Sequence, residues 1–223
     1  MIPLKDDNPT QTYPYVTISI IVINIVVFFF EISLGSDISL FLNRYGAKPL
    51  FVLNMTSPFG YPSPFITIFT SMFLHGGILH VGGNMLYLWI FGNNIEDSMG
   101  HVRFIIFYLV SGIVAVYAFS LLNPNSIVPM VGASGAVSGV LGAYLILFPR
   151  AKVLTLVPLG FYMQVIKVPA IFVLGMWIIV QIINGSVIRG GGGGVAWFAH
   201  IGGFAAGMAL ISMFKKRKRV VWQ

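Results

Sequence analysis

Hydrophobic residues in this chain fall into long runs separated by short polar segments. The first run, from about Val16 to Leu34, is nearly continuous and long enough to cross a hydrocarbon core of about 30 Å. The second run starts near Ile78. Four more cover about 104–122, 132–148, 169–183 and 196–214. This pattern predicts six membrane-spanning helices.

The segments between these runs carry the helix breakers. Residues 35–61 mix charged residues, proline and glycine with aromatic and aliphatic residues, which predicts a loop lying in the membrane interface. Asn123-Pro124-Asn125 ends the third run and Pro149-Arg150 ends the fourth. Five consecutive glycines, Gly190–Gly194, predict a flexible connection between the fifth and sixth spans.

The composition agrees with a membrane protein. Hydrophobic residues make up 57% of the chain and charged residues 9%, whereas soluble proteins are about a quarter charged. We therefore predict an all-α, polytopic six-helix bundle. It comprises an N-terminal lead (1–15), a membrane domain (16–214) and a basic tail (215–223).

The basic residues indicate the orientation. With both termini in the cytoplasm, ten of the thirteen Lys and Arg residues lie inside, and Arg44, Lys48 and Arg189 lie outside. Five of the ten form the run Lys215–Arg219 after the last span. We interpret that run as a topology signal; nucleic-acid binding is the less favoured alternative. The chain has no cysteine, and His75 and His80 lack a third ligand at suitable spacing, so we expect no metal or other cofactor.

Two polar residues are expected at the same depth in the membrane. Ser134 lies 15 positions before Pro149, about 22 Å at 1.5 Å per residue, which is less than the thickness of the hydrocarbon core. His200 lies 14 positions before Phe214, or about 21 Å. Both distances are measured from the cytoplasmic side, so the serine and the histidine should lie level with each other inside the bilayer.

Small residues follow both of these side chains at intervals of four. Gly135, Gly139 and Ala143 follow Ser134, and Gly203 and Gly207 follow His200. Such stripes let two helix backbones approach closely. If the stripes face each other, Ser134 meets His200, and a histidine beside a serine is the arrangement that activates a hydroxyl nucleophile. The alternatives are a packing serine and a histidine that is structural or part of an ion path.

The second span adds two hydrogen-bond donors. His80 and Asn84 are four residues apart and so share one helix face. Donors fixed in a water-poor site stabilise the negative charge that develops on a carbonyl oxygen during acyl transfer. Spans two, four and six contain no Asp or Glu, which leaves no acid on them to complete a triad.

Taken together, these motifs resemble the rhomboid intramembrane serine proteases over about residues 16–214. The matching positions, in family order, are His75, His80 and Asn84; Glu96, Gly100, Arg103 and Phe104; Gly132-Ala133-Ser134-Gly135; and Ala199-His200 with Gly203 and Gly207. The resemblance implies a Ser134–His200 dyad and an oxyanion site formed by His80, Asn84 and the backbone N–H of Ser134. It also implies structural roles for His75, Glu96, Arg103 and the glycines, with a solvated surface pair as the alternative for Glu96 and Arg103.

This sequence departs from many relatives at two places. The position four after the serine, where many relatives carry an aromatic residue that covers the imidazole, is Ser138 here. We therefore expect His200 to be packed differently, with Ser138 as a second candidate hydroxyl. The Trp-Arg pair found in the first outer loop of some relatives is also missing, because Arg44 has no tryptophan near it.

The resemblance implies cleavage of single-pass transmembrane proteins inside the lipid bilayer, with substrates admitted near span five. We expect no nucleic-acid partner and a prokaryotic plasma membrane location. Two other functions stay open: a catalytically silent escort protein, and a small transporter that uses His80, Asn84 and His200 as a relay. The silent protein should have lost the serine or the histidine, and the transporter should carry mid-membrane acids and internal repeats.

Overall fold

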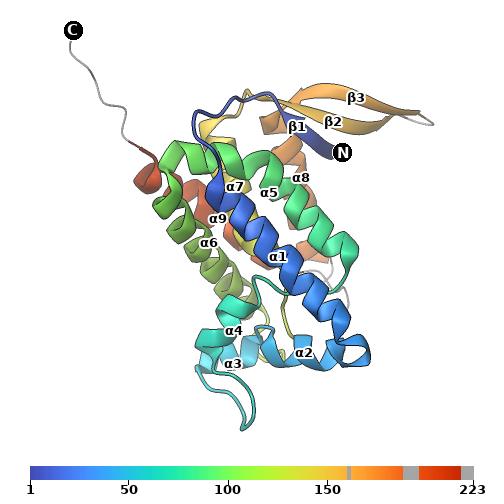
Figure 1. Cartoon of the computed structure of the whole chain (residues 1–223), viewed down its shortest axis with the longest axis vertical. Helices are drawn as coiled ribbons and strands as arrows, with labels where there is room; N and C mark the ends of the chain where they lie inside the picture. Colours follow the sequence, from blue (N-terminus) through green and yellow to red (C-terminus); the bar gives the residue numbers. More distant parts are fainter. Residues whose placement is uncertain (160–161, 188–195, 217–223) are drawn as a thin grey trace.

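The computed structural model describes residues 1–159, 162–187 and 196–216. In this part of the chain the six long helices are α1 (Tyr15–Ser33), α5 (Ile78–Met99), α6 (His101–Leu122), α7 (Ser134–Leu147), α8 (Ala170–Val187) and α9 (Trp197–Phe214). Each helix coincides with one predicted span to within a few residues (Figure 1). The predicted helical membrane bundle is therefore confirmed.

The six helices differ in apolar character. By length and composition, α1, α6, α8 and α9 could each cross a membrane, and α7 is a shorter apolar helix. Helix α5 has 22 residues but carries His80, Asn84 and a polar end from Asn93 to Asp97. It is long enough to span, and its polar residues need protein partners rather than lipid.

The loop predicted for residues 35–61 is largely helical instead. A 3₁₀ turn η1 (Gly35–Asp37) leads into α2 (Ile38–Tyr45) and α3 (Pro49–Asn54), and α4 (Pro64–Thr70) follows. The proline that opens α3 and α4 suits the first turn of a helix, where its missing N–H costs nothing. These short helices gather at one end of the bundle (Figure 1). The glycine run Gly190–Gly194 lies outside the described residues.

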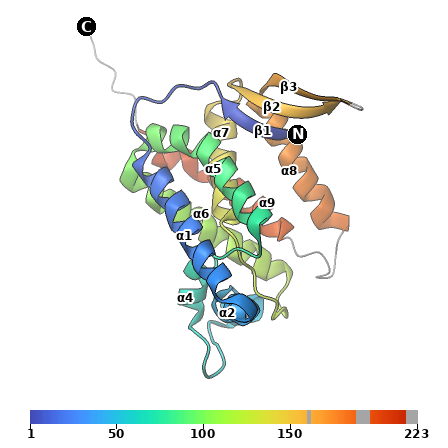
Figure 2. The ribbon, with the colours of Figure 1, turned by 45° about the vertical axis from the view of Figure 1, so that its right-hand side comes forward.

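A small antiparallel sheet, which the sequence analysis did not predict, covers the opposite end of the bundle (Figure 2). Its order is β1 (Ile2–Asp6), β2 (Lys152–Leu159), β3 (Tyr162–Pro169). Strands β2 and β3 pair from Lys152 with Pro169 to Leu159 with Tyr162, and both are rich in the β-branched residues that favour strands. The N-terminal lead therefore folds as the third strand of a sheet whose other two strands connect α7 to α8.

Side-chain hydrogen bonds anchor this sheet to the bundle. The Tyr144 hydroxyl of α7 donates to Asp6 Oδ2 at 2.7 Å. Burial raises the pKa of the Asp6 carboxyl, while this hydrogen bond acts in the opposite direction. Lys216 Nζ donates to the Asp97 carbonyl at 3.0 Å, and the Gln11 and Thr12 N–H groups donate to the Asp97 carboxylate. The lead and the start of the tail thus meet the same α5–α6 turn, on the side predicted to be cytoplasmic.

Helix α1 turns its polar residues inward. Its buried positions are Thr17, Ile20, Asn24, Phe28 and Glu31, whose spacing of three and four places them on one face. The opposite face exposes large apolar side chains such as Val26 and Phe29. This reversal of the soluble pattern fits a helix whose outer face meets lipid, because polar groups then require partners inside the protein.

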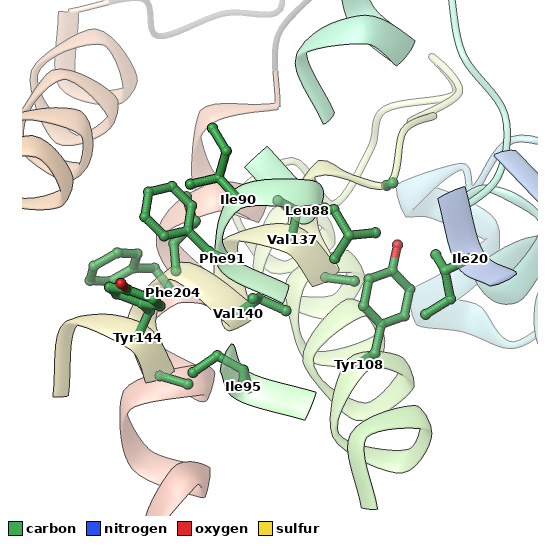
Figure 3. Close-up of a cluster of buried hydrophobic side chains, with 14 of the residues drawn as sticks. Ile20, Leu88, Ile90, Phe91, Ile95, Tyr108, Val137, Val140, Tyr144 and Phe204 are labelled. Carbon is green, nitrogen blue, oxygen red and sulfur yellow. The ribbon is translucent and has the colours of Figure 1, made fainter. Parts of the chain in front are cut away.

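Helix α7 lies at the centre of the bundle. All of its residues from Gly135 to Tyr144 are buried. Large apolar side chains surround it, including Phe91 of α5, Tyr108 of α6 and Phe204 of α9 (Figure 3). Because neighbouring helices cover this segment on every side, the shortness of α7 exposes no polar backbone to lipid.

Glycines bring α7 and α9 into backbone contact. A Cβ added at Gly203 would overlap the carbonyl oxygen of Gly135, and one added at Gly207 would overlap that of Gly139. A Cβ at Gly142 would likewise overlap the Phe204 carbonyl. The two stripes of small residues therefore face each other, and any side chain at these positions would push the helices apart.

This packing predicts that one methyl group added at the α7–α9 contact lowers the stability of the protein. Gly207→Ala should destabilise the protein by about 1–3 kcal/mol, because the methyl overlaps the backbone of α7. The matched control is Gly175→Ala on α8, where a Cβ meets no atom within 4 Å. The control should be neutral or more stable by up to about 1 kcal/mol, since alanine favours helix. Equal stability of the two variants in reversible unfolding from mixed micelles would contradict the close contact.

Candidate active site

Side chains from five of the long helices line one cavity of about 920 Å³. They include Ser134 and Ser138 of α7, His80 and Asn84 of α5, and His200 of α9, and α8 contributes Trp177 and Gln181. This volume is within the range of small-molecule and peptide sites, roughly 300–1,000 Å³. The residues that the sequence predicted as reactive thus share one space.

Gly132 sets His80 against the start of α7. The backbone of Gly132 has φ +126°, which side-chain-bearing residues rarely adopt. The imidazole of His80 fills the place of its missing side chain: Nε2 would lie 2.6 Å from a Cβ at this position. Any residue other than glycine would therefore strain the backbone and displace His80.

His75 holds Asn84 in place beneath this contact. The ring is fully buried, and its Nδ1 donates to the Phe73 carbonyl at 3.3 Å. The Asn84 amide donates to Nε2 of the same ring at 3.0 Å, and the Ala133 N–H approaches that atom at 3.5 Å. One of the two amide hydrogens of Asn84 is occupied in this way, which leaves the other for a ligand in the cavity.

Glu31 supports the loop that carries His75. Its buried carboxylate accepts the His75 backbone N–H at 3.1 and 3.3 Å. Glu31 belongs to α1 and was not among the residues predicted to support the site. Thr17, Asn24 and Glu31 follow one another at intervals of seven residues, and this spacing was the signal that could have placed Glu31 on the inner face of α1.

Ser134 occupies the first position of α7. The N–H groups in the first turn of a helix have no carbonyl partner within that helix, and they form the positive end of its dipole. Ser134 therefore combines a hydroxyl with backbone donors at one edge of the cavity. This geometry suits the binding of an oxygen that gains negative charge.

His200 has its own partners. Its Nδ1 lies 2.7 Å from Gln181 Oε1 of α8, and the ring is 9% exposed. The rings of Trp177 and Trp197 lie 5.8 and 6.3 Å from the imidazole, centroid to centroid. Aromatic cover thus comes from α8 and from the start of α9 rather than from position 138. Ser134 and His200 both lie within the described residues and form no hydrogen bond with each other. Catalytic hydrogen bonds of this kind commonly tighten only when substrate binds.

Ser138 is engaged with its own helix. Its hydroxyl donates to the Ser134 carbonyl at 2.6 Å, and the residue is fully buried. A hydroxyl held by the preceding turn is poorly placed to attack a ligand. This contact favours Ser134 over Ser138 as the reactive hydroxyl.

Glu96 and Arg103 do not bind each other. Glu96 is buried and accepts the backbone N–H groups of Val16 and Thr17, which fixes the start of α1, and it lies 2.6 Å from His101 Nδ1. Arg103 Nη1 donates to the Phe214 carbonyl at the end of α9 at 3.4 Å. Both side chains thus tie helix ends together at the α5–α6 turn, each through its own partner.

Comparison with known proteins assigns the family. The family model for the rhomboid domain matches residues 62–217, which include all of the cavity residues named above. The chain belongs to the rhomboid family. With its apolar helices, this rhomboid is an integral membrane protein.

Relatives of this rhomboid include one named as a protease and one named as inactive. It is 32% identical to rhomboid protease GluP of Bacillus subtilis over 92% of this chain and 36% of that protein. It is 43% identical to the mitochondrial rhomboid protein 1 of Saccharomyces cerevisiae over 44% of this chain and 29% of that protein. Inactive rhomboid protein 1 of Drosophila melanogaster is 31% identical over 52% of this chain and 8% of that protein. The chain spans about a third of the length of GluP and of the yeast relative.

Gln181 was not among the site residues predicted from the sequence. Gln181 is a long polar side chain within the mostly apolar fifth span. Polar residues inside a membrane segment mark functional sites often enough to serve as a signal. The structure places this one against His200.

The two serines of this rhomboid should differ in reactivity toward a fluorophosphonate probe. Ser134→Ala should abolish labelling, because the free hydroxyl is lost from the cavity edge. Ser138→Ala should retain labelling within about threefold, since that hydroxyl is bound to its own helix. In-gel fluorescence measures the extent of labelling, and peptide mapping identifies the labelled residue. A label on Ser138 in the wild type would show that Ser138, not Ser134, is the nucleophile.

Proposed function

We propose that this rhomboid is an intramembrane serine endopeptidase that cleaves transmembrane segments of single-pass proteins. The observation that carries the proposal is one cavity lined by Ser134, His200, His80 and Asn84 at the start of the short central helix. The relative named as a rhomboid protease, GluP, supports it.

The proposed reaction begins at Ser134. Nε2 of His200 takes the hydroxyl proton as Oγ attacks the scissile carbonyl carbon, and a tetrahedral oxyanion forms. The C–N bond then breaks as the imidazolium delivers its proton to the leaving amine. Water attacks the resulting acyl-enzyme, with His200 again acting as base. This releases the new carboxylate and restores Ser134.

Three donors would hold the oxyanion. They are the Ser134 backbone N–H, the free amide hydrogen of Asn84 and the imidazole of His80. The His75 contact fixes the Asn84 amide, and Gly132 fixes the ring of His80. Donors that are already oriented need no rearrangement as charge develops, which is where their catalytic value lies.

A substrate helix has its backbone hydrogen bonds satisfied internally, so it must unwind before a carbonyl reaches Ser134. We propose that it enters near α8. Trp177 and Gln181 place α8 on the wall of the cavity, and lipid-facing residues such as Phe172 and Ile183 cover the outer side of the helix. The helix is therefore a single layer between the site and the membrane.

The second candidate is a silent rhomboid that binds membrane proteins without cutting them, and the relative named as inactive favours it. It would be expected to have lost the serine or the histidine, and this chain retains both. A transporter receives less support, since none of the described residues that line the cavity is acidic.

We also propose a prokaryotic plasma membrane as the location. The relative aligned over 92% of the chain is bacterial. Relatives named as mitochondrial align over less than half of the chain.

The dyad makes a direct prediction. In proteoliposomes with a fluorescent single-pass substrate, Ser134→Ala and His200→Ala should each reduce cleavage at least about 1,000-fold, because each removes an obligatory group. Undiminished cleavage in either variant would refute the dyad. Substrate capture by the Ser134→Ala protein, with no cleavage by the wild type, would favour the silent binding protein.

The oxyanion donors should contribute less than the dyad. His80→Ala and Asn84→Ala should each lower kcat by about 10- to 1,000-fold with little change in KM, since their effect arises in the transition state. His101→Ala at the α5–α6 turn is the control and should keep kcat within about twofold, because it lies outside the cavity. A rise in KM with unchanged kcat would assign these residues to substrate binding instead.

A further inference from the structure

Gln181 occupies the position relative to His200 that a carboxylate occupies in a serine-protease triad. Its Oε1 lies 2.7 Å from His200 Nδ1, and the two side chains are 6% and 9% exposed. The six acidic residues of the chain are Asp6, Asp7, Glu31, Asp37, Glu96 and Asp97, and none of them belongs to α7, α8 or α9. A neutral amide therefore faces the candidate base where no acid is present.

The contacts of Gln181 determine which atom faces the ring. Its amide nitrogen donates to the Trp177 carbonyl one turn earlier at 3.3 Å. A carbonyl oxygen can only accept, so this contact fixes the NH₂ group toward Trp177 and the oxygen toward His200. An oxygen at 2.7 Å from an imidazole nitrogen requires that nitrogen to carry the hydrogen.

The tautomer of His200 follows. With the hydrogen on Nδ1, the lone pair of the neutral ring is on Nε2, which has no partner among the described residues. Nε2 is the atom that a general base needs free. The rings of Trp177 and Trp197 pack near the imidazole and limit its rotation, so the hydrogen bond and the aromatic contacts together orient the base.

We propose that Gln181 is the positioning residue of the catalytic base: it fixes the Nδ1–H tautomer of His200 and stabilises the imidazolium formed during the reaction. This inference rests on the proposed peptidase function. The amide dipole of Gln181 would orient the His200 imidazole as the acid of a triad does. It would do so without an ion in the membrane, where an unpaired charge is costly.

The test replaces Gln181 by Met, which has similar size and no acceptor oxygen of this kind, and by Glu, which restores an oxygen. In proteoliposomes with the single-pass substrate, Q181M should lower kcat about 10- to 100-fold and leave KM within about twofold, because the mispositioned base affects the chemical step. Q181E should recover most of kcat. Val180→Ala, on the exposed face of the same helix, is the control and should match the wild type.

A spectroscopic readout separates positioning from stability. The chain has four histidines, so ¹⁵N spectra of histidine-labelled protein can be assigned by comparison with His200→Ala. Wild type should show a protonated Nδ1 and an unprotonated Nε2 at His200 in the neutral ring, and Q181M should show a mixture of tautomers. Thermal unfolding of each variant, measured in parallel, identifies any loss caused by misfolding. If Q181M does not fold, the spectra of wild type and Q181E decide.

The outcomes distinguish the two proposals. Ser134-dependent cleavage with an unchanged kcat in Q181M, or an unprotonated Nδ1 in the wild type, would overturn the role of Gln181 and leave the peptidase function standing. Absence of Ser134-dependent cleavage in the wild type would overturn the peptidase function, and the catalytic role of Gln181 with it.

Discussion

The arrangement of the site depends on the backbone contact between α7 and α9. Glycines at the interface let the carbonyl groups of one helix lie where a neighbouring side chain would otherwise be. In lipid no hydrophobic force drives helices together, so this close fit supplies much of the association through van der Waals contact. The first of these contacts is between Gly135 and Gly203. Ser134 directly precedes Gly135, and His200 lies about one turn before Gly203, so this contact also sets the separation of Ser134 and His200. Packing and proposed chemistry therefore share the same few positions.

Polar groups within the bundle are organised as supports. Glu31 holds the His75 backbone, His75 holds Asn84, and Gln181 holds His200. At the opposite end, Glu96 fixes the start of α1. Each contact gives a buried polar group a partner that the membrane cannot supply, which is why these groups are tolerated. Rigid support of this kind is also what a site needs if its donors are to be oriented before substrate arrives.

The sequence predicted the six spans because long apolar runs and their breakers report directly on membrane thickness. It also placed Ser134 and His200 at one depth, since helix rise is constant. The sheet was not predicted because residues 152–168 lie between two apolar runs and were assigned no structure. The pairing of β1 with β2 also joins segments about 150 residues apart. Gln181 was missed for a related reason. Its importance lies in a contact between α8 and α9, and periodicity within one helix carries no information about which neighbour a polar side chain meets.

The sheet gives α8 two unlike ends. At its start, the Ala170 and Ile171 N–H groups bind the carbonyls of Ala151 and Pro149, and β3 runs directly into the helix. Gln181 lies three turns further along, toward the opposite end. If a substrate entered beside α8 as proposed, a shift of its far half about this fixed start would separate Gln181 from His200 as the cavity widened. His200 would then be oriented as a base only after α8 had returned. Substrate entry and cleavage would therefore be successive steps, and the open site would be inactive.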